Sequence, residues 1–368
     1  MEVKFLDLKK QYSLLKNEID PAVQAVFAEA DFIKGAEVKK FEAGFAAYCG
    51  AGHCISCGNG TDALTALLKV HDFPRGSEVI LPANTFVATA EAVISNGLKP
   101  VFADIKEDFT VSPESVESLI NQNTCAIIAV HLYGHPADMD ALKKIAEKHD
   151  LKLFEDAAQA HGAIYRGKKV GTLADGAGFS FYPGKVLGSA GDAGAIILND
   201  EKLAETARKF CNHGRSQKYF HEFAGINSRM DTLQAAVLNV KLKHLDEWVE
   251  ARNSVAEMYI GQLSGVSEIV LPKIYPETTD AWHLFVIKTE KRDNLREYLK
   301  NCGIETGIHY PLSLPEQPVF AGHLNYCADY RAVKESKTLL SLPIGEHLGV
   351  KEVAFVAGKI KEFFTKNI

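Results

Sequence analysis

HCISCGNGTDALTALLKVH, residues 53–71, is the stretch that decides the fold. A short apolar run is followed by a glycine-containing turn and then by apolar residues at helical spacing. The same alternation recurs in the next hundred residues: EVILP (78–82), TFVATAEAVISNG (85–97), PVFADI (100–105), CAIIAVHLYG (125–134) and DMDALKKIAEKHD (138–150). Strands that alternate with helices in this way predict an α/β fold with a mostly parallel, helix-covered sheet.

Further apolar runs extend the predicted sheet: LKLFEDAA (151–158), GAGFSFYP (176–183) and DAGAIILN (192–199). After residue 228 the pattern changes, because residues 230–263 hold apolar positions at helical spacing without Gly or Pro until near their end. We expect a long connecting helix here, broken at most once. The strand candidate WHLFVIKT (282–289) and two helical segments (292–303 and 352–367) follow. We therefore predict a large domain over residues 1–245, with an N-terminal arm, and a smaller α+β domain over residues 246–368.

Composition and charge exclude several classes of partner. The net charge is -6 and the sequence contains no block of Lys and Arg, so no basic face for nucleic acid is expected. No stretch approaches the ~20 apolar residues of a membrane span, and the N-terminus does not resemble a signal peptide. We expect a cytoplasmic protein with neither a membrane nor a nucleic-acid partner.

The cysteines indicate reduced thiols. Seven cysteines, an odd number, are scattered along the chain, which is not typical of a disulfide framework. Cys54 and Cys57 form a CxxC, but no second CxxC or His pair completes a zinc site. We interpret both as ordinary strand cysteines and expect no metal.

The loop CGNGTDAL (57–64) follows a predicted strand and opens a helix. Gly58 and Gly60 allow a tight turn, and the amides at a helix start suit a phosphate. The spacing is also GxGxxA, the dinucleotide fingerprint, which would require an acidic residue about 20 positions later. The next strand instead ends in Pro82 and Ala83, followed by Asn84. A phosphate cradle for a smaller cofactor, a plain structural turn and an NAD-dependent oxidoreductase all remain open from this loop alone.

Two further segments carry candidate chemistry. In FEDAAQAHG (154–162), Glu155 and Asp156 end an apolar strand, at the sheet edge where α/β ligands bind. An isolated Asp at this place could equally be a helix N-cap. In GFSFYPGKVLGSAGDAGAI (178–196), Lys185 lies in a glycine-rich turn between two apolar strands. Alone it could be a surface lysine. Together, a phosphate cradle, an Asp at the sheet edge and a loop Lys are the three anchors that pyridoxal phosphate requires.

The order of motifs extends this hypothesis over nearly the whole chain. The motifs are FLDLKKQY (5–12), FIKGAEVKKFE (32–42), CGNGTDAL, LPANTFVATA (81–90), PVFADI, LYGHPADMD (132–140), FEDAAQAHG, FSFYPGK (179–185), GINSRMDTLQAA (225–236) and GIHYPLSLPEQ (307–317). With them the chain resembles the DegT/DnrJ/StrS group of nucleotide-sugar aminotransferases, a branch of the aspartate aminotransferase superfamily. The resemblance implies the fold type I of pyridoxal-phosphate enzymes, with a seven-stranded sheet.

The resemblance also implies a role for individual residues. Lys185 would carry the cofactor as a Schiff base and then move the proton during transamination, while Asp156 would pair with the pyridine nitrogen. Gln159 would contact the phenolic oxygen of the ring, and Phe86 would stack on its outer face. The phosphate ligands implied are Gly60, Thr61, Ser180 and, from the neighbouring subunit of a homodimer, Asn227. By resemblance, His309 and Tyr310 would lie near the sugar.

The implied reaction is a ping-pong transamination with L-glutamate as amino donor and a nucleotide-linked keto sugar as acceptor, for the biosynthesis of amino sugars in polysaccharide, lipopolysaccharide or other glycans. Asp62, which follows Thr61, resembles relatives that aminate C3, so we favour a 3-keto over a 4-keto sugar. Asp62 could instead stabilise the helix dipole without any substrate. A lysine-bearing lyase and a non-catalytic regulatory or interaction protein on the same fold remain alternatives.

Overall fold

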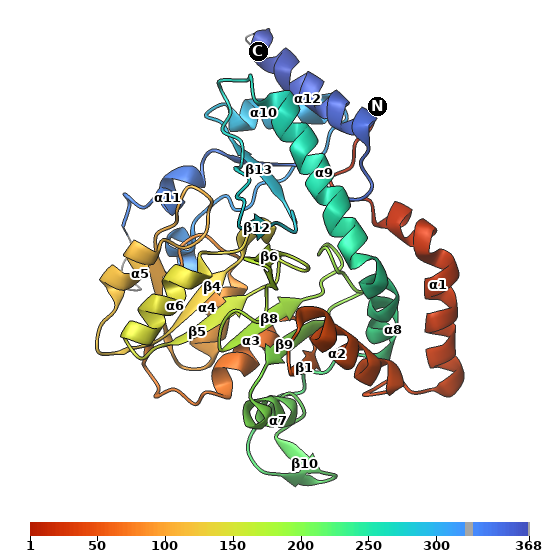
Figure 1. Ribbon diagram of the computed structural model, residues 1–368, viewed down its shortest axis with the longest axis vertical. Coiled ribbons are helices and arrows are strands. Elements are labelled where there is room, and N and C mark those ends of the chain that lie inside the picture. Colours follow the sequence, from red (N-terminus) through yellow and green to blue (C-terminus); the bar gives the residue numbers. More distant parts are fainter. Residues whose placement is uncertain (321–326, 367–368) are drawn as a thin grey trace.

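The computed structural model describes residues 1–320 and 327–366, and a seven-stranded sheet forms its centre (Figure 1). The strands, in spatial order, are β1 (His53–Cys57), β9 (Gly194–Leu198), β8 (Gly176–Ser180), β5 (Lys152–Asp156), β4 (Thr124–Val130), β2 (Glu78–Pro82) and β3 (Lys99–Ala103). Only β9 runs antiparallel to its neighbours β1 and β8, while the other pairs are parallel. The predicted α/β fold is confirmed.

Helices cover both faces of the sheet, as strands buried on both sides require. The helices that flank it are α2 (Ala36–Cys49), α3 (Gly60–Lys69), α4 (Ala88–Ser95), α5 (Pro113–Leu119), α6 (Met139–Lys148), α7 (Glu201–Phe210) and α8 (Thr232–Lys241). Side chains alternate between faces along β2: Val79 and Leu81 pack with residues of α3, α4 and α7, whereas Ile80 packs with residues of α5 and α6. The apolar runs in the sequence are therefore fully buried strands.

The long helix predicted after residue 228 is present and is broken once. Helix α8 passes through one 3-10 turn, η2 (Leu242–His244), into α9 (Leu245–Leu263). Leu245 and Val249 pack against the sheet core, while Val255 and Tyr259 belong to a second core. The helix thus connects the two cores, as Figure 1 shows.

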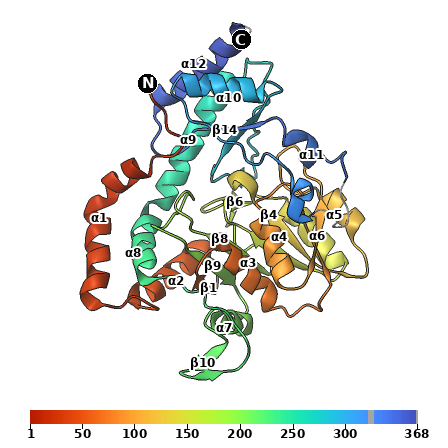
Figure 2. The ribbon, with the colours of Figure 1, turned by 180° about the vertical axis from the view of Figure 1, so that it is seen from behind.

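The second core is built by the C-terminal part of the chain. Its elements are β13 (Phe285–Lys288), α10 (Arg292–Asn301), β14 (Leu339–Leu342) and α12 (Val350–Thr365), with β13 and β14 antiparallel. Val3, from the other end of the chain, also lies in this core and pairs with Ile304. Figure 2 shows the N-terminus beside α12. The division near residue 245 stays our interpretation, with the N-terminal arm crossing it.

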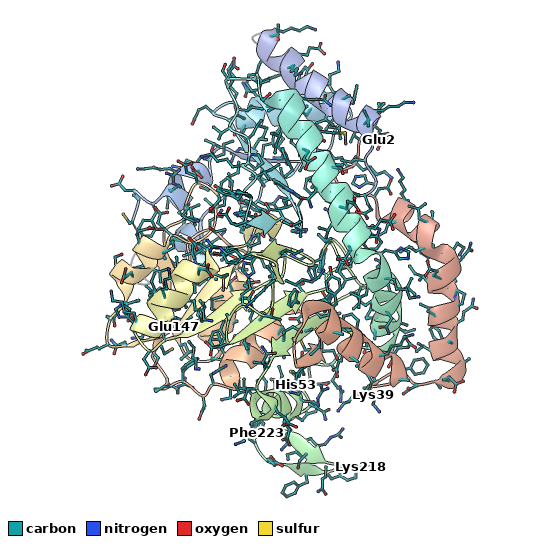
Figure 3. The ribbon with its side chains drawn as sticks, in the orientation of Figure 1. Glu2, Lys39, His53, Glu147, Lys218 and Phe223 are labelled. Carbon is teal, nitrogen blue, oxygen red and sulfur yellow. The ribbon has the colours of Figure 1, made fainter. Side chains whose placement is uncertain are left out.

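Peripheral elements complete the fold. They are α1 (Leu8–Glu29), η1 (Leu132–Gly134), β6 (Ile164–Tyr165), β7 (Lys168–Lys169), β10 (Arg215–Gln217), β11 (Phe220–His221), β12 (Thr278–Thr279), η3 (Leu314–Glu316), η4 (Pro318–Phe320) and α11 (Arg331–Glu335). The β10–β11 hairpin projects away from the sheet, with Lys218 near its end (Figure 3). Within the described residues, no helix is both long and apolar enough to span a membrane.

Candidate functional site

The loop between β1 and α3 forms a cradle at the carboxyl end of β8. Asn59 caps α3, its side chain accepting a hydrogen bond of 2.8 Å from the amide of Asp62. The first amides of a helix have no acceptor within the helix, which leaves those of Gly60 and Thr61 available. A Cβ at Gly60 would lie 2.6 Å from Cβ of Ser180, so glycine is required for this close approach. The predicted phosphate residues of one chain are thereby brought together.

Lys185 lies five residues after Ser180, in the turn that leaves β8. Its backbone amide donates 2.8 Å to the carbonyl of Tyr182. Within the described part of the chain, its ammonium nitrogen has no hydrogen bond or salt bridge. Burial lowers the pKa of Lys185 to about 8, although the carboxylate of Asp156 acts in the opposite direction. Lys185 therefore supplies an amine with a substantial neutral fraction near neutral pH.

Asp156 ends β5 and is 6% exposed. Its Oδ2 accepts a hydrogen bond of 2.7 Å from Oγ1 of Thr89, and its Oδ1 accepts one of 3.2 Å from the amide of Ala158. Burial raises the pKa of Asp156, while these bonds and the nearby Lys185 oppose the rise. A buried carboxylate held at this edge suits a cationic partner, because such a partner offsets its desolvation.

Glu155, the other acid of this motif, has a structural role. It is fully buried and accepts hydrogen bonds from the amides of Gly171, Leu173 and Ala174 at 2.8–3.2 Å. The Nε2 of His131 also lies within hydrogen-bond distance of Oε2 of Glu155, at 3.0 Å. The amide of His131 in turn donates 3.1 Å to the carbonyl of Asp156. Glu155 therefore fixes the backbone beside Asp156.

Gln159 and Tyr310 meet on one side of the site. The Nε2 of Gln159 donates 3.1 Å to the hydroxyl of Tyr310, and its Oε1 accepts 2.7 Å from the amide of Tyr133. The hydroxyl of Tyr133 donates to the carbonyl of His309. The structure thus brings three predicted residues, Gln159, His309 and Tyr310, into one network. Tyr133 connects them, and it was not among the predicted site residues.

Phe86 offers an uncovered aromatic face next to this network. It is 54% exposed, and its ring centroid lies 6.0 Å from that of Tyr310 at a tilt of 40°. Large exposed aromatic side chains leave apolar surface in water. The position suits a planar group that covers this ring.

Three imidazoles near Lys185 are held neutral. Burial, followed by the charge of Lys185, lowers the pKa of His161 to about 3 and that of His309 to about 4. The same two causes, in the same order, take the pKa of His283 well below its usual value. His309 also bonds to the hydroxyl of Ser341 at 2.8 Å. His161 belongs to the FEDAAQAHG motif, which the sequence did reveal, whereas His283 carried no signal.

Asn227 lies apart from this cluster within one chain. It is exposed, and its backbone pairs with Asn212. No hydrogen bond of the described residues joins its side chain to Lys185 or Asp156. The neighbouring Ser228 bonds to the amide of Gly58 at 2.9 Å. Asn227 is therefore the one predicted cofactor residue that a single chain leaves outside the cluster.

The carboxylate of Asp62 is paired with Asn59 of its own loop and with Ser228. Its Oδ2 accepts hydrogen bonds of 2.6 Å from Ser228 and 3.0 Å from Asn59. These contacts agree with a structural role in the first turn of α3, the role that requires no substrate. Cys54 and Cys57 lie in β1 as expected, with buried side chains and thiol pKa values raised by burial.

Comparisons with known proteins agree with this geometry. The family model of the DegT/DnrJ/EryC1/StrS aminotransferase family matches residues 13–361. The chain belongs to this family. A dTDP-3-amino-3,4,6-trideoxy-alpha-D-glucose transaminase from Streptomyces venezuelae is 44% identical over 363 residues, which cover 98% of this chain and 96% of that relative.

Solved structures show the same relationship. The crystal structure of S. venezuelae DesV in complex with a ketimine intermediate superposes with a TM-score of 0.96, at 44% identity and 98% coverage of both chains. NtdA from Bacillus subtilis, solved with the bound cofactor PMP, has a TM-score of 0.91 at 29% identity, covering 99% of this chain and 85% of its own. This aminotransferase therefore has the fold type I architecture and depends on pyridoxal phosphate, as the motifs predicted.

The residues present fit that cofactor. The close approach of Gly60 to Ser180 leaves the helix amides open to a phosphate, and the uncovered ring of Phe86 offers a surface for a planar heterocycle. The half-buried amine of Lys185 and the buried carboxylate of Asp156 supply the other two anchors. The family assignment replaces the NAD-dependent oxidoreductase that the loop spacing had left open.

Proposed function

We propose that this aminotransferase transfers an amino group from L-glutamate to a nucleotide-linked 3-keto sugar. The observation that carries the proposal is the pair formed by Lys185 and Asp156, a half-buried amine of lowered pKa and a buried carboxylate at one sheet edge. The relative from S. venezuelae, named for a 3-amino sugar, supports the choice of C3. The 4-keto sugar remains the second candidate.

Pyridoxal phosphate, when bound, supplies an aldehyde for an amine and a ring that withdraws electrons from the reacting carbon. We propose that Gly60, Thr61 and Ser180 hold its phosphate through amides and a hydroxyl. Asp156 keeps a proton on the pyridine nitrogen, because the two charges offset each other's desolvation.

Gln159 and Phe86 orient the cofactor ring in this proposal. The Nε2 of Gln159, which donates to Tyr310, is the donor for the phenolic oxygen. Phe86 covers the face of the ring that points away from the protein. His309 and Tyr310 lie next to these groups and are proposed to line the sugar site.

Lys185 acts as tether and then as acid and base. A pKa of about 8 leaves roughly a tenth of the amine neutral at pH 7. The neutral nitrogen of Lys185 would hold the cofactor covalently through its aldehyde carbon, with release of water. When a substrate amine takes its place, the freed amine of Lys185 would serve as the base that accepts a proton and the acid that returns it. The three imidazoles nearby are neutral, so they add no positive charge beside Lys185.

A homodimer completes the site in this proposal. Asn227 of the partner subunit is proposed to reach the phosphate, in agreement with its exposed position away from Lys185 in one chain. Exposed apolar side chains such as Phe27 and Tyr182, 60% and 59% exposed, supply surface for the interface.

Free cysteines fit a reducing compartment, and we propose a cytoplasmic location.

Borohydride reduction of the purified enzyme tests the assignment of Lys185. We expect the pyridoxyl mass on the peptide that contains Lys185 and none on Lys241. Lys241 is a matched internal control, because it is also buried with a pKa lowered by burial to about 8. Lys185→Ala should lose both the visible absorbance of the cofactor and turnover. Full activity in Lys185→Ala would exclude the proposed role.

Mixed subunits test the shared site. Lys185→Ala and Asn227→Ala variants are each expected to be inactive or weak. After mixing and exchange, hybrid dimers regain one complete site, so about a quarter of the wild-type activity should return. No recovery, with exchange verified by native mass spectrometry, would place Asn227 outside the partner's site.

A substrate screen tests the reaction itself. Enzyme, glutamate and enzymatically prepared 3-keto or 4-keto nucleotide sugars are incubated, and the aminated product is identified by mass. Glutamate alone should convert the bound cofactor to its amine form, with loss of the visible band. A regulatory protein would show no such change, and a lyase would release product without nitrogen from glutamate.

A further inference from the structure

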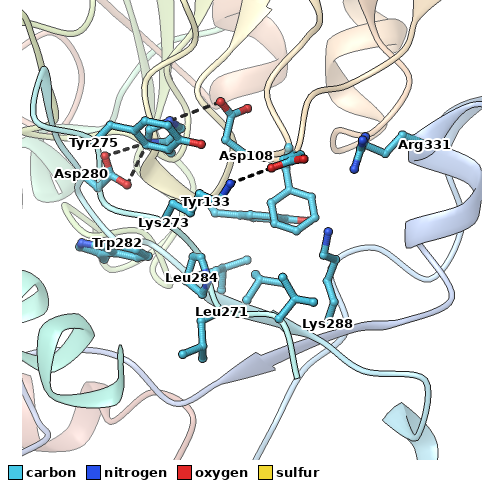
Figure 4. Close-up of a pocket in the computed structure, with 16 residues that line it drawn as sticks. Asp108, Tyr133, Leu271, Lys273, Tyr275, Asp280, Trp282, Leu284, Lys288 and Arg331 are labelled. Atoms are coloured by element: carbon cyan, nitrogen blue, oxygen red, sulfur yellow. Dashed lines mark hydrogen bonds and ion pairs between the residues drawn. The ribbon is translucent and has the colours of Figure 1, made fainter. Parts of the chain in front are cut away.

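A cavity of about 270 Å³ lies beside the site and is lined by none of the predicted cofactor residues. It is enclosed between the segment after β3, the turn after β4 and the strands of the C-terminal part of the chain (Figure 4). Tyr133 forms part of its wall, and the same residue bonds to Gln159 and His309 on the other side. The cavity is thus separated from the catalytic cluster by one aromatic residue.

The aromatic walls of the cavity share an uncommon backbone conformation. Phe109, Tyr133 and Trp282 all line it and have φ values of 69°, 61° and 44°. Bulky residues rarely adopt positive φ, because Cβ then crowds the backbone. Such outliers concentrate where a function requires a particular side-chain placement. Three of them around one cavity indicate that these rings are positioned for a ligand.

Surrounding bonds hold two of these rings in place. The indole of Trp282 donates 3.1 Å to Asn253, and its carbonyl accepts 3.0 Å from Arg252. The hydroxyl of Tyr133 donates to the carbonyl of His309, as described above. The cavity walls are therefore fixed before any ligand enters, which reduces the entropy lost on binding.

One end of the cavity carries an incompletely balanced positive charge. Lys288 and Arg331 both line it and share a single carboxylate, Glu335, at 2.6 Å and 3.0 Å. Glu335 is not part of the lining. Lys288 also lies 5.5 Å from the centre of the Phe109 ring. The pKa of Glu107, which also lines the cavity, is lowered by its hydrogen bond with Lys273 and by the charges of Arg331 and Lys288. Three cations against two anions leave an attractive position for a further anionic group.

The acids at the other end already have partners. Asp280 accepts from His135 at 2.9 Å and from Thr278 at 3.0 Å. Asp108 pairs with Lys106 at 2.9 Å. Lys273, at the rim, pairs with Glu107 at 2.8 Å. Figure 4 places Asp108 and Asp280 away from Arg331 and Lys288. A ligand therefore meets its strongest uncompensated charge at the Lys288 and Arg331 end.

We propose that this cavity is a second ligand site, which binds a small aromatic carboxylate. The ring would lie between the aromatic walls, and the carboxylate would point to Lys288 and Arg331. Aromatic stacking and a charge-assisted hydrogen bond would both contribute to the binding free energy of this ligand. The site is independent of the cofactor and goes beyond the proposed transamination, so its test does not depend on activity.

The chain offers a specific reporter for this site. It contains two tryptophans, Trp248 and Trp282, and only Trp282 lines the cavity. In a Trp248→Phe background of the holoenzyme, the remaining indole reports on the cavity. The probes are 4-hydroxyphenylacetate and its neutral amide, 4-hydroxyphenylacetamide, with calorimetry as the second measurement.

We expect saturable binding of the acid and at least a tenfold weaker affinity for the amide, because the amide lacks the charge. Arg331→Gln should weaken binding of the acid about tenfold and leave the amide unchanged, and Lys288→Gln is the second variant. Arg296→Gln, on the exposed face of α10, is the matched control. Absence of saturable binding, equal affinity for acid and amide, or an acid affinity unchanged in both variants would overturn the proposal.

Discussion

Replacing Thr89 by Val removes one hydroxyl from the carboxylate that we propose to govern the cofactor ring. Oγ1 of Thr89 donates 2.7 Å to Oδ2 of Asp156, and Thr89 is fully buried in α4. Valine keeps the shape of the side chain, so a change in packing contributes little. The substitution removes this hydrogen bond together with the bond between the hydroxyls of Thr89 and Thr85.

The magnitude follows from the charge of the acceptor. A hydrogen bond to a charged group contributes about 1.5–3 kcal/mol, and its loss raises the pKa of Asp156 because the charged form of the acid loses a donor. Burial already raises this pKa in the fold, so folding favours the protonated acid and stability falls as pH rises from the unfolded to the folded pKa. Because Thr89→Val raises the folded pKa further, its penalty should be full at neutral pH and shrink in acid.

Urea unfolding of the cofactor-free protein at several pH values measures this penalty, and spectroscopic titration measures cofactor affinity. Thr85→Val is the matched control, because Thr85 bonds to Thr89 at 3.0 Å and not to Asp156. Its effect should be smaller at every pH. A Thr89→Val penalty that does not depend on pH, or one equal to that of the control, would refute the reasoning.

Three further substitutions have expected outcomes. Gly60→Ala should weaken cofactor binding at least tenfold by equilibrium dialysis, because its Cβ would lie 2.6 Å from Cβ of Ser180; unchanged affinity would contradict the cradle. His161→Phe should make the protein less sensitive to acid between pH 6.5 and about 3, because a histidine buried as the neutral form must gain a proton on unfolding; pH-dependent unfolding measures this, and identical curves would argue against it. Gly358→Ala, in the interior of α12 with open space around it, should raise the free energy of unfolding by about 0.5–1 kcal/mol, with a loss of stability as the contrary result.

Much of the fold was predictable because local pattern and burial agree. Strands β1 to β5 are short apolar runs between helical patterns, and parallel strands buried on both faces need little else. The helix α1 is the counterexample. Its 22 residues include Pro21 and bury only four side chains, so its apolar pattern is weak and predicts no helix there.

The site was predictable where its residues fall within ordered motifs. Lys185, Asp156 and Gln159 each follow or end a strand of the central sheet, so the order of strands brings them to one edge. Thr89 and Tyr133 also lie within motifs, but a hydroxyl on a helix and a tyrosine after a strand have many ordinary uses. Only the contacts of the folded chain give them partners.

The sequence by itself determined the α/β class, and it identified the glycine loop and the lysine on which the pyridoxal-phosphate hypothesis rests, because each depends on neighbours within a few residues. Tertiary structure alone decided the protonation of Lys185 and the three imidazoles, since burial and charge come from distant segments. It also decided that the carboxylate of Asp62 accepts a hydrogen bond from Ser228, and that three aromatic residues with positive φ line one cavity. Contacts of this kind depend on how separate segments meet in space, which no local pattern contains.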